Sequence, residues 1–334
     1  MRWRSQKHAN KPTISIIIAA RNECRHLDEL LPKLQQQQYP TFEIILVLDR
    51  CTDASHELVG KHANEKLKCI TISQVPSGWD GKKYALDQGI KKASNEWLVF
   101  TDADCRPNSE LWLSTLAKEM SGDTDIVLGV SPYKSENQWP GYYIQFEAFI
   151  TYWLYTSLAL LKVPYMCVGR NMAIRRLYFE SLGGYQSIKS INGGDDDLFI
   201  QKATSGTRIK VALGKDALVT TFPKPSWRRY FRQKLRHFSV SQHYKTTHVL
   251  LLSVFHASHL LSIVFLGMTY STDYFLGVLL FYLFIKFVSY RFAANKIGAG
   301  FNYILLPLVD IGYAMLTPVL GIASKLVKDI KWKN

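Results

Sequence analysis

Two aspartates separated by a single residue follow the apolar run W-L-V-F-T at residues 97–101. Because like charges this close repel each other, Asp102 and Asp104 need a positive group beside them. Carboxylate oxygens are the ligands that Mg²⁺ and Mn²⁺ prefer, particularly together with phosphate oxygens. The alternative is helix capping, with Asp104 preceding a helix that has Pro107 near its start. The spacing therefore predicts a Mn²⁺ or Mg²⁺ site, although D-x-D alone is a weak signal.

A second group of carboxylates lies in G-G-D-D-D-L at residues 193–198. Asp195, Asp196 and Asp197 are costly to place together because their charges repel. They therefore form either a functional cluster or an acidic loop on the surface.

Three further positions carry side chains that suit an anionic substrate. Lys82 follows Gly81 at the start of a predicted helix, where free backbone N–H groups and a lysine can face an anion. Gln233 and Arg236 in Q-K-L-R-H lie three residues apart, on one face of a helix. Asp49 ends another strand-like run.

The elements that position these residues alternate along the first 101 residues. Strand-like apolar runs occur at 13–20, 42–48, 67–73 and 96–101, and helical runs separate them. This alternation predicts βαβ units and a mostly parallel sheet with flanking helices, an α/β fold. Ligands of such sheets bind beyond the carboxyl ends of the strands. Three loops should therefore meet at one edge of the sheet, namely 20–23, 49–53 and 102–104.

Two common nucleotide-binding motifs are missing from this part of the sequence. Position 76 is Pro rather than the first Gly of a P-loop, and no G-x-G-x-x-G follows the first strand. Both a P-loop NTPase and a dinucleotide-binding fold are therefore disfavoured.

Taken in order, the segments resemble the family-two inverting glycosyltransferases of GT-A fold over about residues 13–240. The matching segments are S-I-I-I-A-A-R-N-E (15–23), L-D-R-C-T-D-A-S (48–55), G-K-K-Y-A-L (81–86), T-D-A-D (101–104), G-R-N-M-A-I-R-R (169–176) with L-G-G-Y (182–185), G-D-D-D-L (194–198) and Q-K-L-R-H (233–237). Two positions depart from the family pattern. Leu48 replaces the first Asp of D-D-G-S-T-D, and His237 replaces the Trp of Q-x-x-R-W.

The resemblance implies a GT-A-like fold, a metal-bound nucleotide-sugar donor and a catalytic carboxylate. Aligning G-D-D-D-L on Leu198 makes Asp195 the catalytic base, whereas aligning on the glycine makes it Asp196. The metal ligands would be Asp102 and Asp104. The nucleotide-sugar contacts, with a UDP-sugar as the favoured donor, would be Ala20, Arg21, Glu23, Asp49, Lys82 and Asp102. The contacts to the acceptor or the diphosphate would be Arg170, Gln233 and Arg236.

The C-terminal part of the chain is apolar enough to enter a membrane, over residues 248–323. Residues 249–270 contain no Asp, Glu, Lys or Arg, and 274–290 contain only one Lys. A spanning helix needs ~20 apolar residues, so two spans are predicted. A third run, 303–323, is interrupted by Pro307, Asp310 and Pro318, so we expect a re-entrant or interfacial hairpin there. The alternative for the whole region is an apolar helical subdomain.

An aromatic segment at 139–162 has two interpretations. Tyr142, Phe146, Phe149 and Trp153 recur at helical spacing and give one aromatic face. This face would suit either a helix in the membrane interface or a helix packed on the sheet.

The formal net charge of +14 is concentrated just before the apolar runs. From residue 217 to 272 there is no acidic residue, and the first half of this stretch holds Lys224, Arg228, Arg229, Arg232, Lys234, Arg236 and Lys245. Such a cluster suits anionic membrane lipids at about 1 kcal/mol per residue. Membrane lipids, and not nucleic acid, are therefore the expected partners.

The location follows from the two ends of the chain. Residues 1–12 form a basic leader, and the apolar run at 14–20 is too short for a signal-peptide core. We therefore expect a cytoplasmic catalytic domain, 13–240, on a multi-pass protein of the inner membrane. The basic tail 324–334 should also be cytoplasmic.

Together these features predict an inverting, metal-dependent glycosyltransferase that acts on a lipid-linked or membrane-associated acceptor, a lipid or a glycan. One alternative is a processive polysaccharide synthase, but such enzymes need many spans and carry the Trp that His237 replaces. Another is an inactive relative that only binds a sugar nucleotide or a lipid. The intact set of carboxylates argues against this second alternative.

Overall fold

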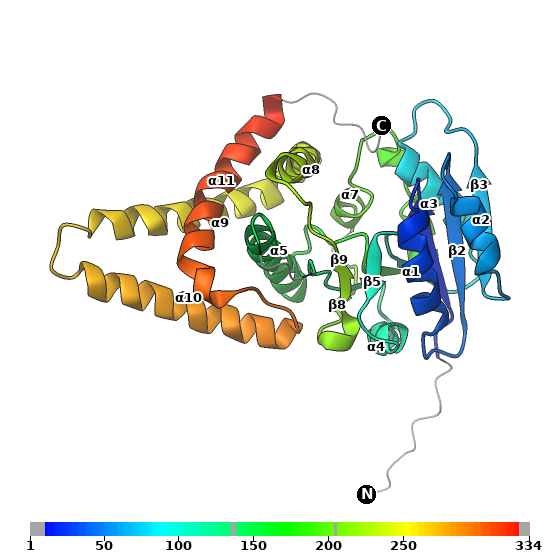
Figure 1. The fold of residues 1–334 in the computed structure, drawn as a ribbon, viewed down its shortest axis with the longest axis horizontal. Coiled ribbons are helices and arrows are strands. Elements are labelled where there is room, and N and C mark those ends of the chain that lie inside the picture. Colours follow the sequence, from blue (N-terminus) through cyan, green and yellow to red (C-terminus); the bar gives the residue numbers. More distant parts are fainter. Residues whose placement is uncertain (1–10, 135–137, 204–205, 327–334) are drawn as a thin grey trace, which may run out of the picture.

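The computed structural model of the chain describes residues 11–134, 138–203 and 206–326. Most of the predicted basic leader, 1–12, and most of the predicted basic tail, 324–334, therefore lie outside the described residues. The described parts form an α/β body and a group of long C-terminal helices (Figure 1).

Among the described residues, the α/β body is built on one large sheet with strand order β3-β2-β1-β4-β7-β6-β8. Its strands are β1 (Ile14–Ala20), β2 (Phe42–Asp49), β3 (Leu67–Ile72), β4 (Trp97–Phe100), β6 (Ile126–Leu128), β7 (Met172–Arg175) and β8 (Ile209–Val211). The first four strands pair in parallel, whereas β7 lies antiparallel between β4 and β6. A smaller sheet joins β5 (Cys105–Pro107) to β9 (Val219–Thr221). The predicted mostly parallel sheet is confirmed.

Helices cover both faces of this sheet, which explains why β1 is apolar at nearly every position. Ile14, Ile16 and Ile18 pack into one buried cluster, and Ile17 and Ala19 pack into the cluster on the opposite face. The covering helices are α1 (Cys24–Gln35), α2 (Ser55–Lys61), α3 (Gly81–Lys92), α4 (Trp112–Glu119) and α5 (Gly141–Leu160). Since β1 and β4 are parallel neighbours, the loops that follow them leave the sheet at the same edge.

Helix α5 lies in the protein interior, between the sheet and the C-terminal helices. Phe146 and Phe149 are fully buried, and both rings pack against Tyr290 and Phe301 from the C-terminal region. Glu147 of α5 forms an ion pair with Lys234, with 2.5 Å between Oε2 and Nζ. Of the two interpretations of the aromatic segment, the structure therefore favours the packed helix.

Short elements complete the α/β body and lead to the C-terminal region. They are α6 (Arg176–Ser181), η1 (Gln186–Ile188), α7 (Asp197–Gln201), η2 (Lys215–Ala217), α8 (Trp227–Val240) and η3 (Ser241–His243). Two contacts tie α7 to the chain that follows α8. The Tyr244 hydroxyl donates to Asp197 Oδ2 over 2.6 Å, and His248 Nδ1 lies 2.8 Å from Gln201 Oε1. Side-chain contacts therefore connect the α/β body to the start of α9, in addition to the covalent chain.

The C-terminal region contains α9 (Thr246–Met268), α10 (Phe275–Ile297), η4 (Tyr303–Leu305) and α11 (Leu306–Leu326). Helices α9 and α10 lie side by side and project from the α/β body, and α11 runs across them (Figure 1). Within the described residues, three segments are long and apolar enough to cross a membrane, namely Thr246–Met268, Phe275–Ile297 and Tyr303–Leu326.

The third segment differs from the prediction. Residues 306–326 form one continuous helix that contains Pro318, rather than a hairpin. In the most apolar window of this segment 39% of the residues are buried, against 6% for each of the other two. The burial arises because α11 packs against α5, α8 and α9. The hairpin prediction is therefore wrong, whereas an interfacial position of this helix stays a prediction.

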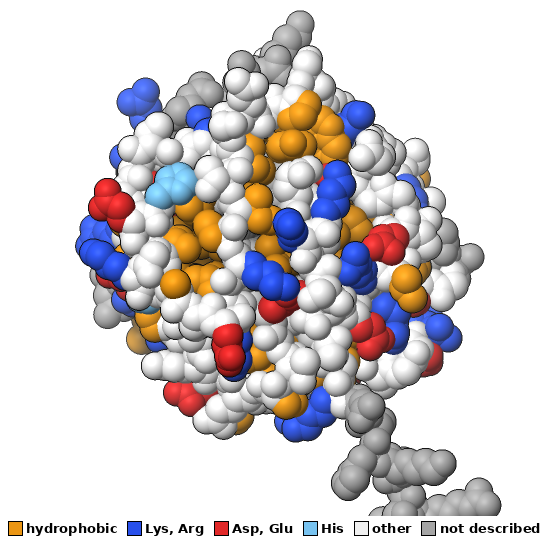
Figure 2. All heavy atoms as spheres, turned by 90° about the vertical axis from the view of Figure 1, so that its right-hand side faces the viewer, with side chains coloured by type: hydrophobic (Ala, Val, Ile, Leu, Met, Phe, Trp, Pro, Cys, Tyr) orange, Lys and Arg blue, Asp and Glu red, His pale blue; other side chains and the backbone are white. Residues whose placement is uncertain are grey.

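The face of the α/β body that is turned away from α9 and α10 exposes side chains of several types. Acidic and basic side chains are interspersed there among apolar ones (Figure 2). Such a mixture is typical of a protein surface in contact with water.

Candidate active site

A cavity of about 940 Å³ lies where the edge of the sheet meets α7 and α8. Residues that are far apart in the sequence line it together. They are Arg21 and Glu23 after β1, Lys82 of α3, Asp102 and Asp104 after β4, Arg170 before β7, Asp195 and Asp196 before α7, and Gln233 and Arg236 of α8. The structure thus brings together ten of the twelve residues that the sequence singled out. Ala20 and Asp49 do not line the cavity.

Lys82 is at the centre of the acidic part of the cavity. Its Nζ lies 3.0 Å from Oδ1 of Asp102 and 3.0 Å from Oδ2 of Asp195. Burial alone would lower the pKa of Lys82, but the charges of Asp102 and Asp195 outweigh it and raise the pKa well above its usual value. The lysine is therefore a permanent cation that joins the strand end to the triple-aspartate segment.

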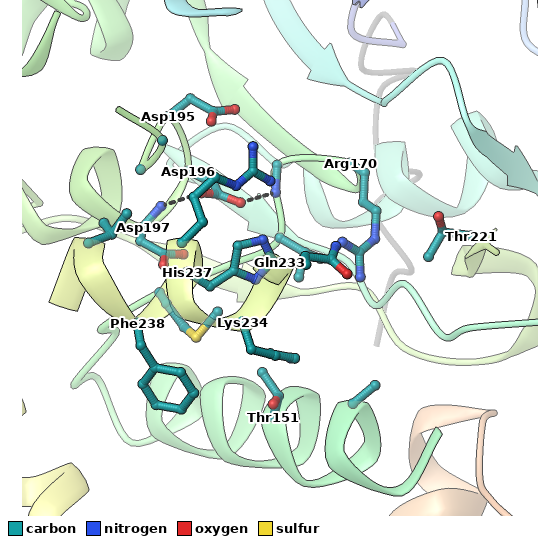
Figure 3. A pocket seen from close by; sticks show the side chains of 18 of the residues that line it. Thr151, Arg170, Asp195, Asp196, Asp197, Thr221, Gln233, Lys234, His237 and Phe238 are labelled. Carbon is teal, nitrogen blue, oxygen red and sulfur yellow. Dashed lines mark hydrogen bonds between the residues drawn. The ribbon is translucent and has the colours of Figure 1, made fainter. Parts of the chain in front are cut away.

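The three consecutive aspartates have different environments (Figure 3). Asp195 is buried, which would raise its pKa, but Lys82 and then Lys83 outweigh burial and lower it. Asp196 accepts hydrogen bonds from the backbone N–H groups of Gly169, over 2.7 Å, and Asp197, over 2.9 Å. Burial and the charge of Asp195 raise the pKa of Asp196. Of the adjacent pair, Asp195 is therefore the member that forms an ion pair with Lys82, whereas Asp196 is held by backbone N–H groups.

Asp197 is directed toward the C-terminal region, where it accepts the hydrogen bond from Tyr244. Burial and the neighbouring charge of Asp196 raise the pKa of Asp197 well above its usual value. The hydrogen bond to Tyr244 acts in the opposite direction but does not outweigh them. Asp197 therefore ties α7 to the chain that leads into α9.

The loop before Asp195 is held by a residue that the sequence analysis did not select. Lys83 is fully buried, and its ammonium group donates to the carbonyl oxygens of Ile191 and Gly193. Gly194 has a φ of 72°, and an added Cβ would lie 2.7 Å from Leu198 Cγ. Lys83 and Gly194 thus fix the path of the loop that leads to Asp195.

The side of the cavity formed by α8 and the loop at 169–170 is basic. Arg170 donates from Nε to Ser131 Oγ over 2.7 Å, and its guanidinium lies over the Tyr133 ring. Gln233 and Arg236 line the cavity from α8, as their spacing predicted. A diphosphate or another anion between the acidic and basic sides would be attracted by these cations.

His237, which takes the place of the family tryptophan, also lines the cavity. The surrounding protein lowers the pKa of His237 well below its usual value, and the neighbouring cations Arg236 and Lys234 act in the same direction. Both effects favour the neutral imidazole, which can either donate or accept a hydrogen bond.

Asp49 lies at the end of β2 outside the cavity lining. Both of its carboxylate oxygens accept hydrogen bonds from the neighbouring Arg50, from Nε over 2.7 Å and from Nη2 over 2.8 Å. A role for Asp49 in contacting the nucleotide sugar stays a prediction, and in this structure both of its carboxylate oxygens bind Arg50.

A divalent cation fits the end of β4. Asp102, Asp104 and Cys105 each have one ligand atom within 4.8 Å of the others. Burial raises the pKa of the Cys105 thiol well above its usual value, and sulfur ligands suit softer metals than Mg²⁺ or Mn²⁺. The two carboxylates are left as donors, and oxygen donors suit Mg²⁺ or Mn²⁺.

Comparison with known proteins shows the family to which this chain belongs. Residues 15–183 match the family described as Glycosyl transferase family 2, and the chain belongs to this family. The chain is 25% identical over 248 residues to the probable glycosyltransferase YdaM of Bacillus subtilis (strain 168), which covers 70% of this chain and 56% of YdaM. It is 25% identical over 190 residues to the beta-monoglucosyldiacylglycerol synthase of Nostoc sp. (strain PCC 7120 / SAG 25.82 / UTEX 2576), covering 55% of this chain and 40% of that protein.

A third relative is the 4,4'-diaponeurosporenoate glycosyltransferase of Staphylococcus haemolyticus (strain JCSC1435), 35% identical over 98 residues, 29% of this chain and 26% of that protein. The matches thus span about half or less of the length of these curated relatives. Among solved structures, the chain is similar to the mannosyltransferase PcManGT from Pyrobaculum calidifontis in complex with GDP-Man and Mn²⁺. The TM-score is 0.56 at 17% identity, over 95% of this chain and 86% of that chain. This likeness supports the predicted GT-A-like fold.

Proposed function

We propose that the protein is an inverting glycosyltransferase. It transfers a sugar from a nucleotide-sugar donor, with a UDP-sugar as the first candidate, to a hydroxyl of a lipid-linked or membrane-associated acceptor. The observation that carries the proposal is the placement of Asp102, Lys82 and Asp195 in one cavity, with 3.0 Å between the lysine nitrogen and each carboxylate. A donor diphosphate, a metal and a general base can meet there.

The donor end of the cavity would be the acidic end, at the edge of the sheet. Asp102 and Asp104 would hold Mn²⁺ or Mg²⁺, which when bound supplies positive charge to the diphosphate. Lys82 would move from its carboxylate partners to the diphosphate and neutralise charge on the leaving group. Arg21 and Glu23 also line this end and are proposed to contact the nucleotide.

Asp195 is proposed as the general base. It would accept the proton of an acceptor hydroxyl while the hydroxyl oxygen attacks the anomeric carbon and the nucleoside diphosphate leaves. A single displacement of this kind inverts the anomeric configuration. Asp196 suits the role less well, because backbone N–H groups already occupy its carboxylate oxygens.

The acceptor end of the cavity would be the end that faces the long helices. Leu252 and His256 of α9 and Tyr313 and Thr317 of α11 line the cavity together with the catalytic carboxylates. An acceptor that lies in a membrane could therefore reach Asp195 from this side. The names of two relatives, a monoglucosyldiacylglycerol synthase and a diaponeurosporenoate glycosyltransferase, support a lipid acceptor. We propose a multi-pass protein of the inner membrane with the α/β body in the cytoplasm.

The experiment that tests the function uses the purified full-length protein in detergent with Mn²⁺. A panel of UDP- and GDP-sugars is screened for release of the nucleoside diphosphate, first without an acceptor and then with diacylglycerol. Release from one donor, and its loss in Asp195→Asn, is the expected result. A protein that releases nucleoside diphosphate from no donor would exclude the proposed function.

A further inference from the structure

A polar cluster lies among the three apolar helices, outside the candidate active site. Asp310 of α11 is 1% exposed, and its carboxylate accepts hydrogen bonds from Lys286 Nζ of α10 over 2.6 and 2.8 Å. The same carboxylate lies 3.0 Å from Nε2 of His259 of α9 and accepts from the Tyr282 hydroxyl over 2.8 Å. One carboxylate therefore joins α9, α10 and α11.

Such a cluster is not needed to make apolar helices associate. Ionisable side chains within membrane helices are energetically costly, face the interior of the helix group and mark positions with a function. Apolar residues of similar size would pack at the same place without charge. We therefore look for a function that apolar packing could not supply, such as fixing the helices in one relative position through directional hydrogen bonds.

The contacts of α9 indicate that these hydrogen bonds set the position of this helix. Throughout this fully described helix the buried residues are His248 and His259. His248 contacts Gln201 of α7, and His259 contacts Asp310 of α11. Leu251, Leu252 and Phe255 of α9 pack against the core only partly buried. The buried contacts of α9 to α7 and α11 therefore run through these two histidines.

The same face of α11 continues from the cluster to the cavity. Tyr313 and Thr317 follow Asp310 at the i+3 and i+7 positions, which share one helix face, and both line the cavity. The Tyr313 ring lies 5.5 Å from the His259 ring and 5.9 Å from the His256 ring. A shift of α11 at Asp310 would therefore displace the cavity wall.

We propose that Asp310, with Lys286 and His259, is a positioning residue for the end of the cavity that faces the long helices. The cluster holds α11 in register against α9, so that Tyr313 and Thr317 stay in the cavity wall. It touches no reacting group. That this end receives the acceptor rests on the proposed function, whereas the positioning of α11 does not.

The direct test measures access to this wall. The full-length protein is placed in phosphatidylglycerol nanodiscs with Cys24, Cys51 and Cys69 replaced by Ser, because Cys105 and Cys167 are buried. Thr317, which is 7% exposed, is changed to Cys, and its rate of modification by a small water-soluble methanethiosulfonate is measured. Asp310→Asn should raise this rate about ten-fold, since local opening of α11 becomes easier. The matched control is Leu308→Ala at an exposed position of the same helix, which should leave the rate unchanged.

A second variant distinguishes two explanations of a raised rate, namely loss of the hydrogen bonds that position α11 and the presence of an unpaired buried charge. Asp310→Leu combined with Lys286→Leu removes both charges and leaves no unpaired ion, so the helices should still associate. If the cluster positions α11, the Thr317→Cys rate stays high in this variant. A return to the parent rate, or no effect of Asp310→Asn, would overturn the proposal. The double variant also carries the test if Asp310→Asn does not fold.

A kinetic readout connects the cluster to the acceptor. With the donor identified by the panel, nucleoside diphosphate release without acceptor should change less than about two-fold in Asp310→Asn, while KM for dioleoylglycerol rises at least about five-fold. Failure of the parent protein to cleave any donor would reject the proposed function but would leave the cysteine result standing. An unchanged cysteine rate in an active enzyme would instead reject only the positioning role.

Discussion

The ammonium nitrogen of Lys82 lies 3.0 Å from Oδ2 of Asp195. This ion pair distinguishes Asp195 from Asp196 and supports its assignment as the base. Asp195→Asn should lower the rate of the chemical step at least about 10²-fold, the usual size of a general-base effect, while nucleotide affinity changes little. Single-turnover transfer and calorimetric binding of the nucleotide measure the two quantities.

Asp196→Asn is the matched variant for this prediction. An amide at position 196 would turn a donor toward the N–H of Gly169 or Asp197, so stability should fall by about 1–3 kcal/mol. Activity should be lost to a smaller extent than in Asp195→Asn. The reverse order of activities would show that the base is Asp196.

The end of β4 carries the second prediction. Asp102→Asn and Asp104→Asn should each abolish transfer and metal-dependent nucleotide binding, because each removes a charge that must balance a cation. The fold should be retained, as judged by circular dichroism. EDTA should have the same effect on the parent enzyme, and Mn²⁺ or Mg²⁺ should restore it. Full activity of Asp104→Asn, or an enzyme indifferent to EDTA, would contradict the metal role.

Lys83 is the subject of the third prediction. Lys83→Met would leave the carbonyl groups of Ile191 and Gly193 without the donor that holds them, so we expect a loss of about 1–3 kcal/mol in stability and a lower transfer rate. Thermal unfolding and initial rates measure both. Lys92→Met, at an exposed position of the same helix, is the control and should behave like the parent. Equal stability of the two variants would show that the clamp is unimportant.

The fourth prediction concerns membrane topology. If α9 and α10 each cross the membrane once, as we propose, the end of α10 lies on the same side as the α/β body, and α11 packs against α8 of that body. We therefore expect two full spans, with the chain end in the cytoplasm. A cysteine introduced near Asn334 should react with an impermeant reagent only after intact cells are permeabilised. Ready labelling of intact cells would mean three crossings.

The fifth prediction concerns stability at acid pH. Burial would raise the pKa of Glu43, but hydrogen bonds from Lys68, Ser15 and Ser94 outweigh it and lower the pKa from 4.5 to about 2. Because the folded-state pKa is depressed, the stabilisation is present above the unfolded value and is lost as pH falls toward the folded value. The unfolding temperature of Glu43→Gln should therefore fall less between pH 6 and pH 3 than that of the parent. Glu65→Gln, at an exposed position, is the control and should fall as the parent does.

The strands were predictable because burial on both faces leaves a clear mark on composition. The runs at 13–20 and 42–48 became β1 and β2 with a difference of one residue at one end. The same physical reason places Asp102 and Asp104 at the edge of the sheet, since a charge pair cannot continue a strand that is buried on both faces.

Side-chain partners across long separations were not predictable. Lys82 and Lys83 are the same residue type at adjacent positions, yet α-helical geometry turns them about 100° apart. One meets Asp102 and Asp195, and the other meets two carbonyl groups of a loop. No local pattern specifies these pairings, and even the family resemblance specified only that Lys82 belongs to the site.

The hairpin predicted for residues 303–323 was wrong for a related reason. Asp310 and Pro318 were interpreted as interruptions of an apolar helix, because each is unfavourable against lipid. In the structure Asp310 has partners on two other helices, and Pro318 lies within a continuous helix. The partners that make a polar residue acceptable lie 24 and 51 residues away in the chain, beyond any local rule.

The side-chain contacts between α7 and the start of α9 set a boundary for protein engineering. Tyr244 and His248 belong to the stretch that a truncation after Val240 would remove, yet their partners Asp197 and Gln201 belong to the helix beside the proposed base, Asp195. Such a truncation would remove the Tyr244 hydroxyl from the half-buried Asp197 carboxylate and the His248 ring from Oε1 of Gln201, both within a few residues of Asp195. A shortened protein for crystallisation should therefore extend through His248, with the first turn of α9 kept as part of the water-facing portion.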